Sequence, residues 1–141
     1  MSNNLRFKTS KFIDETYRVS FKFNNKTYFG FKGDTLASAL LANGIHLVGR
    51  SFKYHRPRGI MTSGSEEPNA IIQLHDNSSR TEPNVRATEV EIYEGLVASS
   101  QNCWPSVNFD IGGINNLLSP ILPAGFYYKT FMWPKSFWYK V

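Results

Sequence analysis

The sequence predicts an α+β fold in which a mixed sheet carries one main helix. Three observations support this fold: apolar residues that alternate around an asparagine pair, a capped apolar stretch after them, and later segments with strand composition. The predicted order is strand, strand, helix, strand, strand. An irregular, aromatic-rich extension follows at the C-terminal end.

The first predicted element is a β-hairpin that begins at residue 17 and ends at residue 31. On its first strand, apolar residues alternate with polar ones: Tyr17, Val19, Phe21 and Phe23. Alternation with a period of two indicates a strand with one buried face. Asn24 and Asn25 come next, and asparagine tolerates the positive φ angles of a tight two-residue turn. These two residues therefore mark the hairpin turn.

The second predicted element is a helix between Asp34 and Gly44. Asp34 is the expected N-cap, because a carboxylate can accept the free N–H groups of the first turn. Gly44 is the expected residue just past the helix end, where a positive φ angle is common. We expect the helix to bury Leu36, Leu40 and Leu41 against the hairpin.

The remaining part of the predicted domain alternates extended segments with loops. Ile45–Val48 is expected to be a short strand or the entrance to one, and Gly49–Pro68 is expected to be a long loop rich in Arg, Pro, Gly and Ser. Two further strands are expected at Asn69–His75 and Val85–Tyr93, on either side of a polar turn at Asp76–Ser79. Loops as long as Gly49–Pro68 are usually functional or packed against another part of the protein.

The pattern changes after about residue 95. Prolines interrupt any regular period, at Pro105, Pro120 and Pro123, although Ile114–Leu118 is long enough for one helical turn. The predicted divisions are an N-terminal arm (1–16), an α+β domain (17–95), and an irregular extension with an aromatic tail (96–141).

Composition restricts the possible functions. The chain has a formal net charge of +5 and a single cysteine, Cys103, which excludes an internal disulfide. No signal-peptide or membrane-spanning segment is apparent, so we expect a cytoplasmic protein. The three histidines lack the spacing of a metal site, and no nucleophile has a recognisable base. We therefore expect no catalytic residue and no metal ligand in this chain.

Five strings of residues carry a specific resemblance to one family. In their order along the chain they are Gly33–Ile45, Tyr54–Gly59, Glu66–Ala70, Glu82–Thr88 and Phe126–Pro134. Together they resemble the N-terminal region of the alpha subunit of heterotetrameric sarcosine oxidases. The resemblance implies that residues 17–95 are a ferredoxin-like β-grasp domain without a cluster, at the start of a much longer chain.

The resemblance also implies a function for the parent complex. Enzymes of this family are flavoproteins that demethylate sarcosine oxidatively and can pass the one-carbon unit to tetrahydrofolate. The implied cofactors of that complex are FAD, FMN, NAD and tetrahydrofolate, and none of them is expected in this segment. The implied partners are the rest of the alpha subunit and the other subunits.

One departure from the layout of cluster-bearing relatives matters most. Plant-type ferredoxins hold a [2Fe–2S] cluster with cysteines at C-x4-C-x2-C and a fourth cysteine downstream. Alignment with that pattern places Met61, Glu66, Asn69 and Thr88 at the four positions. None of these side chains is a thiolate, so no cluster is expected. Glu66 and Glu67 are expected to be solvated or to pair with nearby arginines.

Residues 50–58, named here the basic loop, form the first candidate interface. Its candidate residues are Arg50, Lys53, Tyr54, His55, Arg56 and Arg58. Cations interleaved with aromatic rings suit the phosphates and bases of a nucleic acid. The alternative is that the arginines bind carboxylates and carbonyl groups inside a protein assembly. We favour the second interpretation, because Arg-Pro-Arg is too rigid and too short to follow a nucleic-acid strand.

The aromatic tail is the second candidate interface. Residues 126–141 hold eight of the 21 Phe, Trp and Tyr residues of the chain. The candidate docking residues are Phe126, Tyr127, Tyr128, Phe131, Trp133 and Trp138. Pro134 and the lack of a helical period argue against a membrane-surface helix. The remaining alternatives are that the tail wraps back on the core of the domain or docks on the remainder of the subunit. We expect docking, and self-association if the tail stays exposed.

These observations predict a non-catalytic structural domain that scaffolds a sarcosine oxidase. The alternative is a free-standing module whose basic loop binds nucleic acid or another anionic partner. Salt-dependent binding to generic RNA or single-stranded DNA would distinguish the two.

Overall fold

A computed structural model of the chain describes residues 5–6, 12–75 and 80–120. The candidate residues of the aromatic tail, Phe126, Tyr127, Tyr128, Phe131, Trp133 and Trp138, lie outside this range. Within the described part, no helix is both long enough and apolar enough to cross a membrane.

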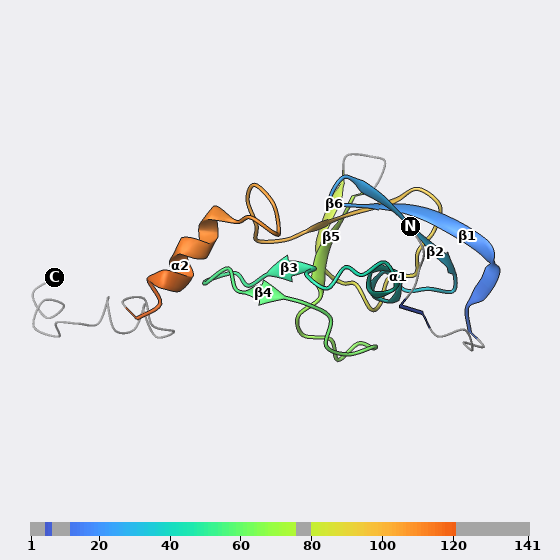
Figure 1. Cartoon of the computed structure of the whole chain (residues 1–141), viewed down its shortest axis with the longest axis horizontal. Coiled ribbons are helices and arrows are strands. Elements are labelled where there is room, and N and C mark those ends of the chain that lie inside the picture. Colours follow the sequence, from blue (N-terminus) through green and yellow to red (C-terminus); the bar gives the residue numbers. More distant parts are fainter. Residues whose placement is uncertain (1–4, 7–11, 76–79, 121–141) are drawn as a thin grey trace, which may run out of the picture.

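The fold consists of a five-stranded mixed sheet, a separate two-stranded hairpin and one main helix (Figure 1). The elements are β1 (Asp14–Phe23), β2 (Lys26–Lys32), α1 (Leu36–Ala42), β3 (Gly49–Arg50), β4 (Pro57–Arg58), β5 (Ile71–His75), β6 (Thr81–Arg86), β7 (Leu96–Ser100), the 3₁₀ turn η1 (Ile111–Gly113) and α2 (Ile114–Leu117). The large sheet has the order β2-β1-β7-β5-β6, in which β1 and β7 are parallel and the other neighbours antiparallel. This arrangement confirms the predicted α+β, ferredoxin-like β-grasp fold.

The predicted hairpin is present as β1 and β2. Asn24 and Asn25 have φ angles of 49° and 63°, so both occupy the left-handed region expected for this turn. The alternation along β1 buries Val19, Phe21 and Phe23. Both the alternation along β1 and the asparagine turn therefore have the structure that the sequence predicts.

The helix is present, but its N-cap differs from the prediction. Thr35 is the N-cap, and its hydroxyl accepts a hydrogen bond from the Ser38 N–H at 3.2 Å. Asp34 is fully buried and accepts hydrogen bonds from the guanidinium of Arg6 and the backbone N–H of Phe31 instead. The carboxylate of Asp34, which was expected to cap the helix, therefore forms a long-range ion pair with Arg6.

The C-terminal end of α1 matches the prediction. Gly44 has a φ angle of 77°, and its N–H donates to the Leu41 carbonyl at 2.9 Å, while the Ile45 N–H donates to the Leu40 carbonyl at 2.9 Å. This pair of bonds is a Schellman motif, which needs a left-handed residue just past the helix end. Leu36 and Leu40 are buried as expected, but Leu41 is 37% exposed, so its predicted burial is wrong.

Residues 45–48 are the entrance to β3, which is one of the two alternatives expected for them. The strand expected over 85–93 is wrong in its bounds, because β6 begins at Thr81 and ends at Arg86. Past β6, the Leu36 N–H donates to the Val90 carbonyl and the Ile92 N–H donates to the Asp34 carbonyl. This segment therefore satisfies its backbone at the start of α1 and does not continue the sheet.

The irregular structure expected from residue 96 onward is wrong for residues 96–100. These residues form β7, which lies between β1 and β5 in the middle of the sheet. Leu96 and Ala98 are buried and join the main core. The predicted helical turn near residues 114–118 is confirmed by α2.

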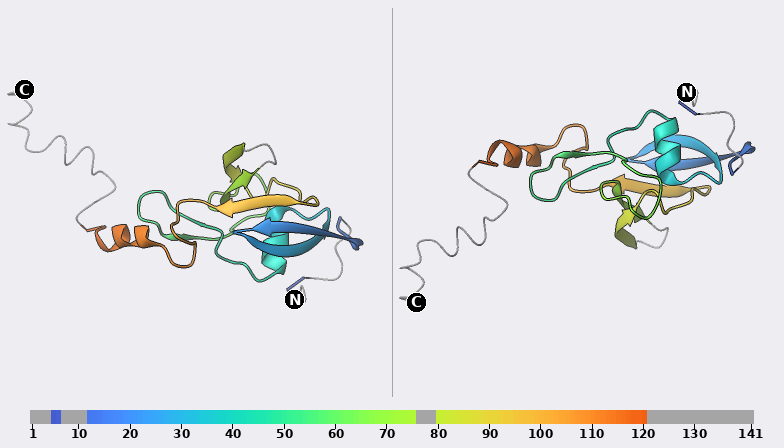
Figure 2. Two further views of the ribbon diagram at one scale, coloured as in Figure 1. Left: turned by 90° about the horizontal axis from the view of Figure 1, so that it is seen from above. Right: turned by 90° about the horizontal axis from the view of Figure 1, so that it is seen from below.

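The core lies between α1 and one face of the sheet (Figure 2). Its largest fully buried apolar side chains are Phe21, Phe23, Leu36, Leu40, Ile72 and Leu96. They come from β1, α1, β5 and β7, so the core depends on elements from both ends of the domain. The basic loop and the residues after β7 lie outside this core.

Candidate docking surface

The basic loop is the tip of a small hairpin formed by β3 and β4. The Ser51 N–H donates to the Arg56 carbonyl at 2.9 Å, and the His55 N–H donates to the Ser51 carbonyl at 3.0 Å. These bonds fold the loop back on itself, with His55 at a positive φ angle of 53°. The hairpin extends from the sheet toward α2 (Figure 1).

Arg50 joins the basic loop to the extension. Its Nε donates to the Val107 carbonyl at 2.8 Å, and its Nη1 donates to the His55 carbonyl at 2.8 Å. Its side chain is only 13% exposed. Arg50 therefore holds two segments that are more than fifty residues apart in sequence and offers little surface to an external ligand.

Asp110 is the second point of attachment. Its carboxylate is fully buried, accepts hydrogen bonds from His55 Nδ1 at 2.7 Å and from the Trp104 N–H at 2.9 Å, and lies 3.7 Å from Arg50 Nε. Burial alone would raise the pKa of Asp110, but the Trp104 N–H and the bond to His55 outweigh it and lower the pKa below its ordinary value. We name this group of Arg50, His55 and Asp110 the clamp.

The other cations of the basic loop also have contacts within the chain. Arg56 Nε donates to Asn116 Oδ1 at 3.1 Å, and Arg58 Nη1 donates to Asn69 Oδ1 at 2.8 Å. Lys53 and Arg56 lie over the ring of Tyr54, at 5.3 and 4.8 Å from its centre. The structure thus brings the six predicted residues of this loop together, and several of them bind the chain itself.

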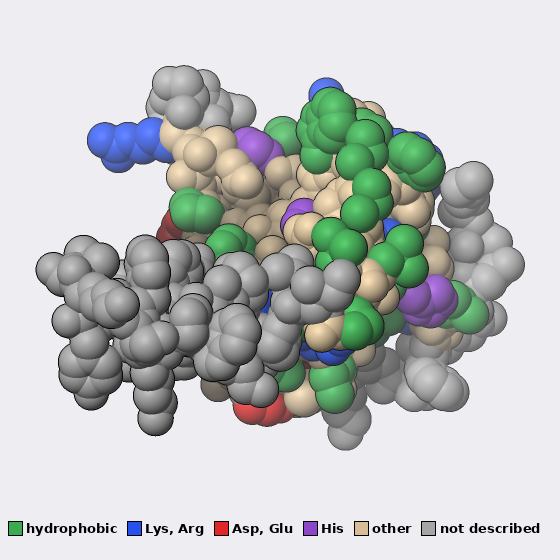
Figure 3. Space-filling view, turned by 90° about the vertical axis from the view of Figure 1, so that its left-hand side faces the viewer, with side chains coloured by type: hydrophobic (Ala, Val, Ile, Leu, Met, Phe, Trp, Pro, Cys, Tyr) green, Lys and Arg blue, Asp and Glu red, His purple; other side chains and the backbone are tan. Residues whose placement is uncertain are grey.

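Sequence reasoning missed the exposed apolar side chains of the extension. Six side chains of the segment that contains Asp110 are exposed and apolar, and we name them the apolar stripe: Trp104, Phe109, Ile111, Ile114, Leu117 and Leu118. Hydrophobic side chains gather on the end of the molecule that faces the viewer in Figure 3. The spacing of three between residues 111, 114 and 117 is a helical period and was the available signal.

Cys103 lies beside the same extension, in a cavity of about 540 Å³ that is also lined by His46, Tyr28 and Val107. Burial raises the pKa of its thiol, and the nearby Asp110 carboxylate raises it further, against a smaller opposite effect of Arg50. A thiol with a raised pKa is a weak nucleophile. The geometry therefore gives Cys103 no catalytic activation.

The four positions aligned with cluster ligands lie around one loop, and their side chains serve other purposes. Asn69 Nδ2 contacts Met61 Sδ, and the Thr88 hydroxyl donates to the Gly64 carbonyl at 2.8 Å. Glu66 is exposed. With a single cysteine in the whole sequence, a four-thiolate set is impossible, so the residues present do not fit a [2Fe–2S] cluster.

Among residues 5–6, 12–75 and 80–120, no three His, Cys, Asp or Glu side chains are grouped so that they could hold a metal ion.

Glu67 departs from its expected role as a solvated charge or arginine partner. Its carboxylate is buried and binds backbone N–H groups. The loop was predicted as irregular, and sequence gave no signal for this burial.

Comparison with known proteins supports the fold and its family. The family model described as "2Fe-2S iron-sulfur cluster binding domain" matches residues 16–103. In the crystal structure of L-proline dehydrogenase from P. horikoshii, a similar fold covers 66% of this chain and 17% of that chain, with a TM-score of 0.51 and 22% identity. This likeness concerns the fold alone.

Curated relatives are closer in sequence. The sarcosine oxidase subunit alpha of Rhizobium meliloti (strain 1021) is 61% identical over 129 residues, which make up 92% of this chain and 13% of the relative. The same-named subunit of Corynebacterium sp. (strain U-96) is 45% identical over 71 residues, or 49% of this chain and 7% of the relative. The chain thus spans a small part of the length of these relatives. It belongs to the family of 2Fe-2S iron–sulfur cluster binding domains, and along most of its length it is similar to sarcosine oxidase alpha subunits.

Proposed function

We propose that this chain is a non-catalytic structural domain of a sarcosine oxidase alpha-type subunit and that it scaffolds the assembly of the enzyme. The single observation that carries this proposal is the apolar stripe, which lies on the segment that the clamp attaches to the basic loop. Phe109 and Leu117 are 69% and 79% exposed. Exposed apolar side chains gathered in this way are typical of a surface that is covered by a partner.

The proposed partner is the remainder of a longer alpha-type chain, together with the other subunits. The share of the Rhizobium meliloti relative that this chain covers, 13%, supports a role as one part of a larger protein. Under this proposal the whole complex demethylates sarcosine oxidatively, and its FAD, FMN, NAD and tetrahydrofolate are bound outside this segment. The cytoplasm remains the predicted location.

The alternative, a nucleic-acid-binding module, has less support from the geometry. Arg50 is committed to the carbonyls of Val107 and His55, and Arg56 and Arg58 bind asparagine side chains. A nucleic acid would have to compete with these contacts for the same guanidinium groups. The contacts match the other interpretation of the basic loop, in which its cations organise a protein interface.

Co-purification tests the proposal. The chain is expressed together with the remaining part of a sarcosine oxidase alpha subunit and the other subunits, and the complex is isolated through a tag on this chain. We expect stoichiometric recovery with the wild type and loss of the partners with Leu117→Asp combined with Ile114→Asp, because each change places a charge in the apolar stripe.

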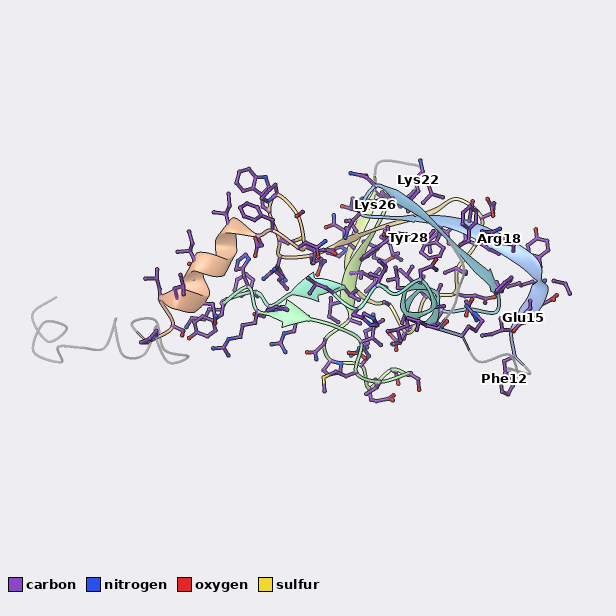
Figure 4. All side chains as sticks on the ribbon, in the orientation of Figure 1. Phe12, Glu15, Arg18, Lys22, Lys26 and Tyr28 are labelled. Atoms are coloured by element: carbon purple, nitrogen blue, oxygen red, sulfur yellow. The ribbon has the colours of Figure 1, made fainter. Side chains whose placement is uncertain are left out.

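The matched control is Phe12→Asp. Phe12 is 91% exposed and lies at the end of the molecule away from α2 (Figure 4). It receives the same kind of charge on an exposed apolar position, and recovery is expected to stay at the wild-type level. Unchanged recovery with the stripe variant, or equal loss with both variants, would contradict the proposed docking surface.

A further inference from the structure

Glu67 is a buried carboxylate whose partners are backbone N–H groups. Its exposed fraction is 1%. Oε2 accepts hydrogen bonds from the N–H groups of Met61 at 2.7 Å and Thr62 at 2.6 Å, and Oε1 accepts from those of Asn69 at 2.8 Å and Ala70 at 3.1 Å. Both oxygens are therefore satisfied, and each one joins two consecutive residues of the loop.

The charge of this carboxylate is stabilised by dipoles. Among the ion pairs of the described residues, none includes Glu67. Burial raises its pKa, but the hydrogen bonds from the Thr62, Asn69 and Met61 N–H groups outweigh this effect and lower the pKa to about 2. Successive N–H groups that converge on one point form an anion-binding cradle.

The cradle coincides with the loop that would have to hold a cluster. Met61 and Asn69 are two of the positions aligned with cluster ligands, and both donate their N–H groups to Glu67. Thr88 is a third aligned position, and its hydroxyl donates a hydrogen bond to the Gly64 carbonyl of the same loop. A [2Fe–2S] cluster with four thiolates is itself an anion, so a loop at this place encloses negative charge in both cases.

We propose that Glu67 is an internal anion that takes the place of the metal cluster, and that the N–H groups of Met61, Thr62, Asn69 and Ala70 form a cradle specific for a small carboxylate. The loop closes around a side chain that the protein supplies itself. Its folding therefore requires no iron or sulfide. This inference does not depend on the proposed docking function.

The first test uses the complete 141-residue chain and two adjacent carboxylates. Glu67→Ala removes the γ-carbon and carboxyl group, a fragment equivalent to acetate, and Glu66→Ala removes the same atoms from an exposed neighbour. We expect Glu67→Ala to lower the thermal midpoint and sodium acetate to restore it more than sodium chloride of equal ionic strength. The Glu66→Ala protein is expected to match the wild type in both salts.

The second test compares amide hydrogen exchange in Glu67→Gln and in the wild type, so it does not depend on the stability of Glu67→Ala. In Glu67→Gln, the amides of Met61, Thr62, Asn69 and Ala70 are expected to lose at least about tenfold in protection, because a charged acceptor is replaced by a weaker neutral one. In the wild type, NMR titration of the Glu67 carboxyl carbon is expected to give a midpoint near 2. A Glu67 titration in the ordinary range, or four amides with unchanged protection, would overturn the proposal.

Discussion

Replacing either partner of the Arg6–Asp34 ion pair is expected to destabilise the whole domain. Asp34 is fully buried and accepts hydrogen bonds from Arg6 Nη1 at 2.9 Å, the Phe31 N–H at 2.9 Å and the Ser38 hydroxyl at 2.8 Å. The Arg6 side chain is itself only 11% exposed. Removal of one partner therefore leaves a buried charge without its counter-ion, which typically costs about 3–5 kcal/mol.

A double-mutant cycle measures this interaction. Asp34→Asn keeps the shape of the side chain but removes its charge, and Arg6→Met removes the guanidinium and keeps an apolar stem. We expect each single variant to lose about 3 kcal/mol of unfolding free energy, and the double variant to lose much less than the sum, with a coupling of about 2 kcal/mol. Urea unfolding at 25 °C gives these free energies.

Ser38→Ala is the control for the cycle. It removes one neutral donor to Asp34 and is expected to cost about 1 kcal/mol. If the two single changes add within about 0.5 kcal/mol, the pair is not coupled, and the segment that contains Arg6 is not anchored to α1 in this way.

Three further predictions concern β7, the clamp and Glu67. A chain truncated after Gly95 lacks Leu96–Ser100, the strand between β1 and β5, and circular dichroism is expected to show no cooperative unfolding; a cooperative transition would contradict the role of β7. Asp110→Asn is expected to raise hydrogen exchange at the Trp104 amide at least about tenfold while the β1 amides stay protected; equal rates in both proteins would refute the clamp. Because the pKa of Glu67 is about 2 in the folded state and 4.5 ordinarily, its ionised form contributes stability above about pH 4.5 that is lost as the pH falls toward 2. Between pH 2 and neutral pH, the gap in unfolding free energy between wild type and Glu67→Gln is expected to change by at most about 3 kcal/mol. A gap that does not change with pH would refute the assignment.

Local patterns explain which elements the sequence predicts well. The first hairpin combines strict alternation with an asparagine turn, and the end of α1 has a glycine at the one position that requires a positive φ angle. Both signals lie within a few residues of the structure that they determine. For the same reason, the fold class followed from sequence although individual strand bounds did not.

Long-range contacts explain what the sequence does not predict. β7 contains one large apolar residue, Leu96, followed by Val97, Ala98 and two serines, and its place in the sheet depends on pairing with β1 and β5. Asp34 has the local features of an N-cap, but Arg6 provides a stronger partner. Glu67 is adjacent to the exposed Glu66, and only the folded loop distinguishes the two carboxylates.

Only the local part of the candidate site could be predicted from the sequence. Clustered charges identified the basic loop, but its partners, Val107, Asp110 and Asn116, lie more than fifty residues away in sequence. Their contribution becomes visible only when the chain folds back on itself. Exposure of the apolar stripe depends likewise on the clamp, which no local pattern specifies.

The position of β7 has a consequence for the order of events during synthesis. A ribosome releases β1 and β2 early, yet β7, the second neighbour of β1 in the sheet, is the last to emerge of the strands that the structure describes. Until then the apolar face of the nascent hairpin has no complete sheet to join, and parallel pairing across such a separation forms slowly. The apolar stripe emerges directly after β7, so a nascent subunit acquires its docking surface only once the domain behind it is able to fold.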